Sequence, residues 1–301
     1  MMRSLQLTFI SLYSFLAWIH CLHAQSPEPA SYLPLIEKLA PLHKKMGPPK
    51  PGDWLATHKE PGQTFVEYVR SNPVKPSGYR QILYVQPLGE FTPSQLKIVQ
   101  QTVQYMQIYF GLTVITKPAI GLEKIPANAR RNHGNQLQLH TKYILHQLLK
   151  PQLPKNALAT IAFTAEDLYP GDGWNYVFGQ ASTRNRVGVW SLRRFGNPDD
   201  SAEAYHQCLR RTIQVACHET SHMLTMRHCT AYECLMAGSN SLDESDRRPI
   251  YNCPECVAKV SWATGSDLLT RYRALHEYAD ELDLTDARVM FERSILELEK
   301  K

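Results

Sequence analysis

The chain has 301 residues, of which 43% are hydrophobic and 20% charged, which is typical of a globular protein and excludes a disordered, collagen-like or coiled-coil chain. Its formal net charge of +5 is too small and too evenly spread to indicate nucleic-acid binding. The mean hydropathy of −0.35 excludes a membrane protein with many spans.

The first 24 residues have the pattern of a secretory signal peptide. Arg3 supplies a positive charge, residues 5–19 form a short apolar stretch, and residues 22–24 (Leu-His-Ala) resemble a cleavage site. An uncleaved membrane anchor is the alternative. Because the apolar stretch is short and interrupted by polar residues, we expect cleavage after Ala24 and export to the periplasm or the extracellular space.

A proline-rich segment follows the signal peptide. Residues 25–76 hold 10 of the 20 prolines, so we expect them to cross the surface as turns and short segments rather than as one long helix. We divide the chain into the signal peptide at 1–24, a proline-rich N-terminal segment at 25–50 and one domain at 51–301.

The regular elements of this domain alternate between strands and helices. Thr92 and Pro93 are typical of a helix start, and Gly111 of a helix end. We expect strands at 80–88, 112–120, 157–169, 175–182 and 185–195, helices at 93–110, 135–149 and 201–226, and one or two amphipathic helices in 266–300. This order predicts an α/β fold in which helices pack on a mixed sheet.

The helix expected at 201–226 carries a zinc-binding pattern, HExxH. His218 and His222 are four residues apart, so they leave the same face of the helix, one turn apart. Glu219 lies beside them and could take a proton from water bound to the metal. Two histidines on a helix with no metal are the alternative.

A third histidine, His228, follows His222 by six residues. On an unbroken helix it would lie about 240° away from His222, so it can join the site only if the helix ends and the chain turns back. In the metzincin pattern HExxHxxGxxH a glycine makes this turn. Thr225 stands at that position, and a left-handed conformation would cost it roughly 1–2 kcal/mol. The chain must accept this strain or turn differently.

Six of the seven cysteines lie in residues 208–256. Cys208 and Cys217 are nine residues apart on one helix and face opposite sides, so we expect two buried free thiols. The other four form closely spaced pairs typical of a structural zinc site with four thiolates: Cys229, Cys234, Cys253 and Cys256. Two disulfides, Cys229–Cys234 and Cys253–Cys256, are the alternative that export would favour.

These motifs together resemble the archaemetzincin family. The resemblance is carried by the array HExxHxxxxxHCx4CxM at 218–236 and CxxC at 253–256, and it extends over roughly residues 50–265. It implies a metzincin-like mixed twisted sheet packed with helices, an active-site helix bearing HExxH, a cysteine zinc knuckle and C-terminal helices. Two features depart from the family: Thr225 replaces the usual glycine, and an export signal is unexpected in a family associated mainly with intracellular surroundings.

The resemblance also implies a role for each residue of the motifs. His218, His222 and His228 would bind a catalytic zinc ion, Glu219 would be the general base, and Met236 would lie beneath the metal. The four cysteines would bind a second, structural zinc ion. Because Cys229 directly follows His228, we expect the second zinc to brace the third histidine, which would allow a threonine at 225.

We therefore expect an exported zinc metallopeptidase that hydrolyses peptide bonds, with Glu219 activating water together with zinc. A peptide or protein substrate would pair with an edge strand near 175–181. We expect no nucleic-acid partner, no membrane contact beyond the export signal, and a monomer. Endopeptidase and aminopeptidase action both stay open. The alternative is a non-catalytic, zinc-stabilised binding protein with a degenerate peptidase site.

Other conspicuous side chains receive simpler interpretations. We expect Tyr232 and Tyr251 to be packed rather than catalytic. The charged run at 243–248 is expected to be a solvent-exposed helix start, with Asp243 a candidate for the helix cap.

Overall fold

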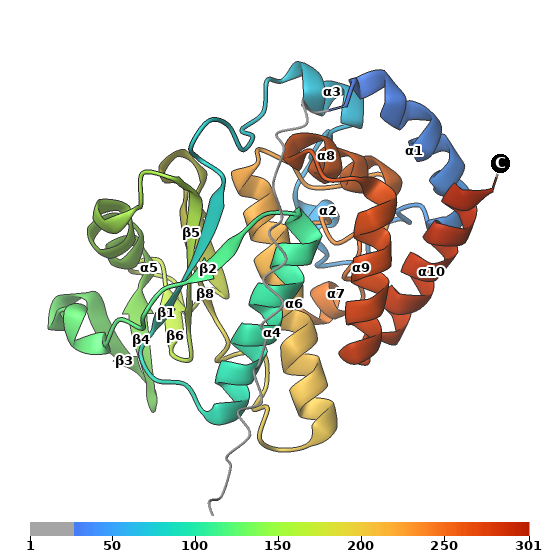
Figure 1. The fold of residues 1–301 in the computed structure, drawn as a ribbon. Helices are drawn as coiled ribbons and strands as arrows, with labels where there is room; N and C mark the ends of the chain where they lie inside the picture. Colours follow the sequence, from blue (N-terminus) through green and yellow to red (C-terminus); the bar gives the residue numbers. More distant parts are fainter. Residues whose placement is uncertain (1–26, 301) are drawn as a thin grey trace, which may run out of the picture.

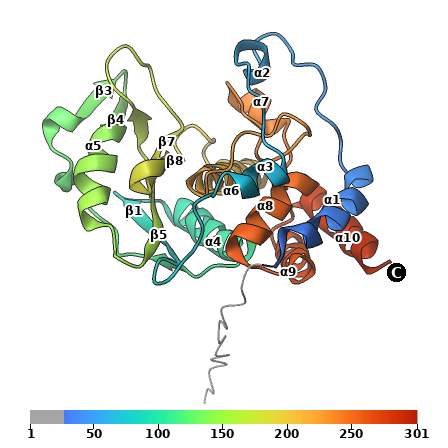
Figure 2. The ribbon, with the colours of Figure 1, turned by 90° about the horizontal axis from the view of Figure 1, so that it is seen from above.

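The computed structural model describes residues 27–300, which form a mixed α/β fold in successive layers (Figure 1). One sheet lies between a short helical segment that includes α5 and the pair of long helices α4 and α6 (Figures 1 and 2). The C-terminal helices pack on the far side of that pair. The expected signal peptide at 1–24 lies outside the described residues. No helix within residues 27–300 is long and apolar enough to cross a membrane.

The central sheet is mixed, as predicted. Its first four strands are parallel, and the last is antiparallel and forms an edge. In spatial order the strands are β2 (Val114–Thr116), β1 (Ile82–Leu88), β5 (Ala157–Thr164), β8 (Val187–Ser191) and β7 (Gly179–Ser182). The edge position of β7 agrees with the edge strand expected near 175–181.

A second, smaller sheet corrects two predictions. Its strands are β3 (Arg130–His133), β4 (Gln136–His140) and β6 (Asp167–Tyr169). The helix expected at 135–149 is wrong in its first part, because the alternation of polar and apolar residues at 136–140 is that of a strand. Only α5 (Thr141–Tyr143) and the π-helical turn Ile144–Leu149 are helical. The single strand expected at 157–169 is two strands in two sheets.

The two long helices begin where local capping chemistry places them. Helix α4 (Pro93–Phe110) has a capping box, in which Thr92 accepts from the backbone of Gln95 and the Gln95 side chain accepts from Thr92, and it ends at the left-handed Gly111. Helix α6 (Ala202–Met223) begins at Ser201, whose hydroxyl accepts a hydrogen bond from Ala204. Both helices confirm the prediction to within three residues.

The remaining helices cover the far side of α4 and α6. These are α1 (Leu33–Leu39), α2 (Trp54–Thr57), α3 (Phe65–Arg70), α7 (Leu242–Asp246), α8 (Pro254–Thr264), α9 (Leu268–Glu281) and α10 (Thr285–Glu299). Helices α9 and α10 confirm the expected C-terminal pair, whereas α8 was not predicted. Short 3₁₀ turns occupy Pro29–Tyr32, Ala40–Leu42, Leu122–Lys124, Ala127–Ala129, Lys150–Gln152 and Thr183–Asn185.

Alternate residues of the sheet strands pack into two hydrophobic cores, one on each face of the sheet. On β8, Trp190 belongs to the larger core with α4, α6 and the C-terminal helices, whereas Val187 and Val189 face the core beneath the segment 141–149. Trp190 has no exposed surface. The sheet is therefore covered on both faces, and α6 packs into the larger core through one face of the helix.

The proline-rich segment wraps around the domain in short pieces, as predicted. Lys45 forms a β-bridge with Tyr232, and the amide of Met46 donates to the carbonyl of Ala231 at 3.0 Å. The amide of Glu233 donates in turn to the carbonyl of Lys44 at 3.0 Å. The segment is thus attached to the loop that contains the first cysteine pair.

Candidate metal centres and active site

Three histidines converge at the C-terminal end of α6. His218 and His222 leave one face of the helix, and His228 returns from the following loop, so that one ring nitrogen of each lies within 4.8 Å of the others. The ring centroids of His222 and His228 are 4.9 Å apart. The structure therefore brings together the three histidines that the sequence predicts as zinc ligands.

Hydrogen bonds fix the orientation of the two helix imidazoles. Nδ1 of His218 lies 2.8 Å from the carbonyl oxygen of Leu235, and Nδ1 of His222 lies 2.7 Å from that of Met226. Because a carbonyl only accepts, each Nδ1 carries the proton and each Nε2 has a free lone pair. The two Nε2 atoms face each other at 3.0 Å, so a cation bound between them would accept both lone pairs. The donor set fits zinc.

His228 is oriented by a carboxylate that sequence reasoning missed. Its Nδ1 lies 3.0 Å from both oxygens of Glu60, which belongs to the N-terminal part of the chain. Metal-binding histidines commonly donate to a carboxylate in this way, which orients the ring and makes it a stronger ligand. Glu60 lies within the region that resembles the family, but it is 168 residues from His228 and outside the histidine and cysteine array, so the metal-binding motif itself does not indicate it.

Burial favours the neutral forms of His218 and His228, which metal binding requires. Burial lowers the pKa of His218 well below its ordinary value, and the neighbouring His222 and His228 lower it further. The pKa of His228 is also lowered, first by burial and then by His222, with Glu60 acting in the opposite direction. A neutral imidazole has the lone pair that a metal needs.

The chain turns back between His222 and His228 by accepting strain at Thr225. This residue has a φ of 62°, so it takes the left-handed conformation usually reserved for glycine. Its amide donates to the carbonyl of His222 at 2.8 Å. Its hydroxyl donates to the carbonyl of Leu224 at 2.6 Å and accepts from the amide of Val74 at 3.2 Å. The side chain thus contributes hydrogen bonds that glycine could not make.

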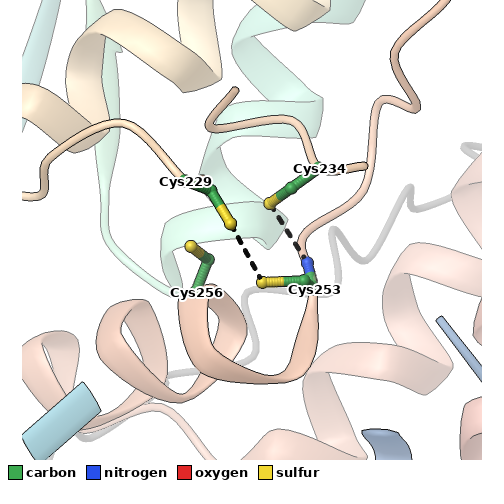
Figure 3. A group of neighbouring side chains, drawn as sticks. All are labelled: Cys229, Cys234, Cys253 and Cys256. Carbon is green, nitrogen blue, oxygen red and sulfur yellow. Dashed lines mark hydrogen bonds between the residues drawn. The ribbon is translucent and has the colours of Figure 1, made fainter. Parts of the chain in front are cut away.

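Four buried cysteines form a second convergent group (Figure 3). Their sulfur atoms all lie within 4.8 Å of one another, and those of Cys229 and Cys253 are 3.7 Å apart. Every described cysteine is a free thiol, so the disulfide alternative is not what the structure contains. The group consists of the four residues that the sequence predicts as a structural zinc site: Cys229, Cys234, Cys253 and Cys256.

The backbone around these cysteines favours thiolates. The amides of Met236 and Cys253 donate to Sγ of Cys234, at 3.4 and 3.2 Å. Cys253 is the N-cap of α8 and Cys256 lies in its first turn, where the helix dipole stabilises negative charge. Burial nevertheless raises the pKa of Cys234 and Cys253 well above the ordinary value, whereas contacts with the other cysteines lower that of Cys229. A cation bound among the sulfurs would stabilise thiolates there.

The two remaining cysteines behave as expected. Cys208 and Cys217 on α6 are fully buried free thiols. Burial raises the pKa of Cys208 to about 11 and raises that of Cys217 further, so both stay protonated and unreactive at neutral pH.

One loop joins the two metal centres. Cys229 follows His228 directly, and its amide donates to the carbonyl of Met236 at 2.7 Å. Met236 is completely buried. The loop that presents the third histidine is therefore closed by the segment that carries Cys234 and Met236.

The three histidines open into a cavity of about 930 Å³. Glu219 also lines this cavity, and burial raises its pKa above the ordinary value for a carboxyl group. Phe178 and Gly179, where edge strand β7 begins, form part of another wall. The cavity therefore places a candidate proton acceptor, the metal ligands and a free sheet edge around one space.

Trp54 forms a wall of this cavity from the N-terminal segment. Its indole stacks on His58 at 3.8 Å between ring centroids and meets the ring of His228 edge-on at 5.1 Å. A β-carbon on Gly238 would come within 2.5 Å of the indole, so only glycine allows this close approach. Sequence reasoning missed Trp54 for the same reason as Glu60.

Comparison with known proteins agrees with this arrangement. The sequence model described as Peptidase family M54 matches residues 113–262. Archaemetzincin-2 of Mus musculus is 33% identical over 262 residues, which cover 76% of this chain and 72% of the mouse protein. The chain belongs to the archaemetzincin family. Membership makes it a zinc metallopeptidase and favours the enzyme over a non-catalytic binding protein.

Two further family members are similar. Archaemetzincin-1 of Homo sapiens is 31% identical over 258 residues, which cover 75% of this chain and 52% of the human protein. The crystal structure of archaemetzincin from Archaeoglobus fulgidus has 27% sequence identity and a TM-score of 0.46, and the match covers 59% of this chain and 99% of that chain.

The role of Glu60 in this metallopeptidase can be tested by metal affinity. Glu60→Ala removes the acceptor that orients His228, so we expect zinc affinity at the histidine site to fall by about 10–100-fold. Competition with a chelator measures this affinity. Glu37→Ala removes an exposed carboxylate from α1 and serves as the control. An unchanged affinity in Glu60→Ala would show that the carboxylate does not support the ligand.

The strained turn gives a second prediction. Thr225→Val keeps the branched side chain in the left-handed conformation but loses both hydroxyl hydrogen bonds, so we expect unfolding free energy to fall by about 1–3 kcal/mol. Thr225→Gly loses the same bonds but relieves roughly 1–2 kcal/mol of strain, and it should lie closer to the wild type. Urea denaturation compares the two. Equal stabilities of the valine and wild-type proteins would contradict a stabilising role of the hydroxyl.

Proposed function

We propose that His218, His222 and His228 bind the catalytic zinc ion of this metallopeptidase and that Glu219 is its general base. The observation that carries the proposal is the convergence of three imidazoles whose Nδ1 atoms are already occupied by acceptors. Their Nε2 atoms are then the available ligands, beside a carboxylate in the same cavity.

The reaction is hydrolysis of a peptide bond. Zinc at this site supplies a Lewis acid that polarises the scissile carbonyl and lowers the pKa of water. Glu219 accepts a proton from the water that attacks the carbonyl carbon, and it then delivers this proton to the leaving amine nitrogen as the C–N bond breaks. The burial that raises the pKa of Glu219 makes its carboxylate a stronger base, which suits both transfers.

An extended peptide is the substrate form that the cavity favours. Strand β7 pairs with β8 on one side only, so its other edge presents backbone groups that a peptide can pair with. Trp174, 61% exposed, and Tyr176 lie on the cavity wall just before this strand and can cover the bound peptide.

The four cysteines complete the proposal. Cys229, Cys234, Cys253 and Cys256 bind a second zinc ion, which has a structural role because four thiolates leave no open position for substrate. The signal-peptide pattern of the first 24 residues supports export of the enzyme to the periplasm or the extracellular space.

Replacement of Glu219 tests the general base. Glu219→Gln keeps the size of the side chain but cannot accept the proton, so we expect peptide hydrolysis to fall by about 10²–10⁴-fold or more with the zinc content unchanged. Hydrolysis of a fluorogenic peptide and elemental analysis of the same sample provide the two measurements. Full activity of this variant would refute the assignment.

Replacement of Cys229 tests whether the second zinc braces the first. Cys229→Ser removes one of four thiolates next to His228, so we expect the protein to lose zinc from both sites. Cys208→Ser, a buried thiol on α6 away from the cluster, should retain both ions. Loss of only the structural zinc in Cys229→Ser would contradict the bracing.

A further inference from the structure

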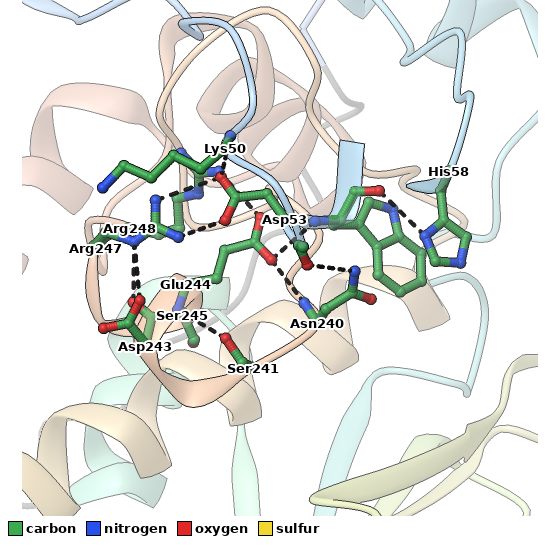
Figure 4. A network of polar contacts seen from close by, with 12 residues as sticks. Lys50, Asp53, His58, Asn240, Ser241, Asp243, Glu244, Ser245, Arg247 and Arg248 are labelled. Carbon is green, nitrogen blue, oxygen red and sulfur yellow. Dashed lines mark hydrogen bonds and ion pairs between the residues drawn. The ribbon is translucent and has the colours of Figure 1, made fainter. Parts of the chain in front are cut away.

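The cavity extends from the histidines to helix α7, where its lining changes character. Leu235, Ala237 and Leu242 give it apolar walls. Beyond them Arg248 lines the same cavity, two residues after the end of α7 (Figure 4). The expectation of a solvent-exposed helix at 243–248 is wrong here, because Arg248 is only 7% exposed.

The guanidinium of Arg248 is poorly satisfied within the protein. Its side chain has one hydrogen bond, from Nη2 to Oε1 of Glu244, with a long separation of 3.3 Å. Its Nε is buried and has no hydrogen-bond partner among the described residues. A buried charged donor without an acceptor is costly, and a negatively charged ligand would relieve that cost.

Glu244 meets this need only in part, because three other hydrogen bonds also occupy its oxygens. This carboxylate is 1% exposed and accepts from the amide of Trp54 through both oxygens, at 3.0 and 2.9 Å. It also accepts from the amide of Asn240 at 2.8 Å (Figure 4). Ser241, not Asp243, caps the helix by accepting from Glu244. Glu244 therefore serves mainly to join α2 to α7.

The cavity lining carries one acidic and one basic side chain. Among the described lysine, arginine, aspartate and glutamate residues, only Glu219 and Arg248 line it, and Glu219 lies beside the metal ligands. Gln214, one turn before His218, is a neutral neighbour whose Nε2 donates to the carbonyl of Ser245 at 3.0 Å. Its buried Oε1 has no partner among the described residues, so an amide is the rival ligand for this wall.

We propose that Arg248 makes this end of the cavity a subsite for a carboxylate of the peptide substrate. The carboxylate belongs either to an acidic side chain near the scissile bond or to the free C-terminus of a short peptide. The apolar walls accept the methylene groups, and the guanidinium binds the charge. The subsite rests on the proposed function of the cavity, which it refines by naming the substrate class.

Binding to the zinc-loaded Glu219→Gln protein tests the subsite without turnover. Fluorescent peptides carry Glu or the isosteric Gln at each position in turn, and a second pair differs only in a free or amidated C-terminus. We expect at least one pair to favour the carboxylate by about tenfold in dissociation constant. Equal affinities in every pair, or a preference for Gln, would overturn the proposal, and the latter would indicate recognition by Gln214.

Variants assign the preference to Arg248. In an otherwise identical protein, Arg248→Gln should remove the preference for the carboxylate and Arg248→Lys should retain part of it. Arg273→Gln is the matched control, because Arg273 pairs with Glu299 at the surface and does not line the cavity. A preference that persists in Arg248→Gln would overturn the proposal.

Two arrangements keep this test decisive. If Arg248→Gln does not fold, Ser245→Asp leaves the arginine in place and introduces a competing carboxylate on the cavity wall, which should abolish the preference. Hydrolysis by the wild-type enzyme distinguishes a failure of the subsite from a failure of the proposed function. Cleavage with no preference in any pair, neither for Glu over Gln nor for a free over an amidated C-terminus, refutes the subsite alone, whereas selective binding with no cleavage of any peptide refutes the proposed function.

Discussion

The active site depends on the reversal of the chain after α6. Helix geometry brings His218 and His222 together but cannot bring His228, so the helix must end within six residues and return. The left-handed Thr225 makes this return, at an energetic cost that its hydroxyl partly offsets through the backbone of Val74 and Leu224. The cysteine group then closes the loop one residue beyond the third histidine.

The N-terminal part of the chain contributes further residues to the active site that α6 carries. It supplies Trp54 to the cavity wall and Glu60 to the third histidine. It is attached by buried or half-buried charges, because Asp53 pairs with Arg247 at 2.6 Å and the amide of Trp54 is held by Glu244. Removing one partner of such a pair leaves a charge without compensation, so these contacts specify the position of the segment.

The sequence predicts those features that depend only on residues close together in the chain. Thr92 at the helix start and the HExxH spacing each act within one or two helical turns, and the structure agrees with them. The strand at 136–140 adjoins a helical pattern, which favours a helix in the sequence. In the structure the buried Gln138 donates to Asp167 and Asn175 and accepts from Arg131. Glu60 and Arg248 depend on tertiary contacts, for which a single sequence carries no periodic signal.

The separation between the two halves of the site has a consequence for folding. Glu60 and His228 are 168 residues apart, and Trp54 and Glu244 are 190 apart, so closing these contacts orders long loops. During synthesis the N-terminal segment is made first. Glu60 and Trp54 can contact His228 and Glu244 only after most of the domain has been made. These contacts can therefore form only after the chain has been synthesised through Glu244, so a shorter nascent chain has no complete active site.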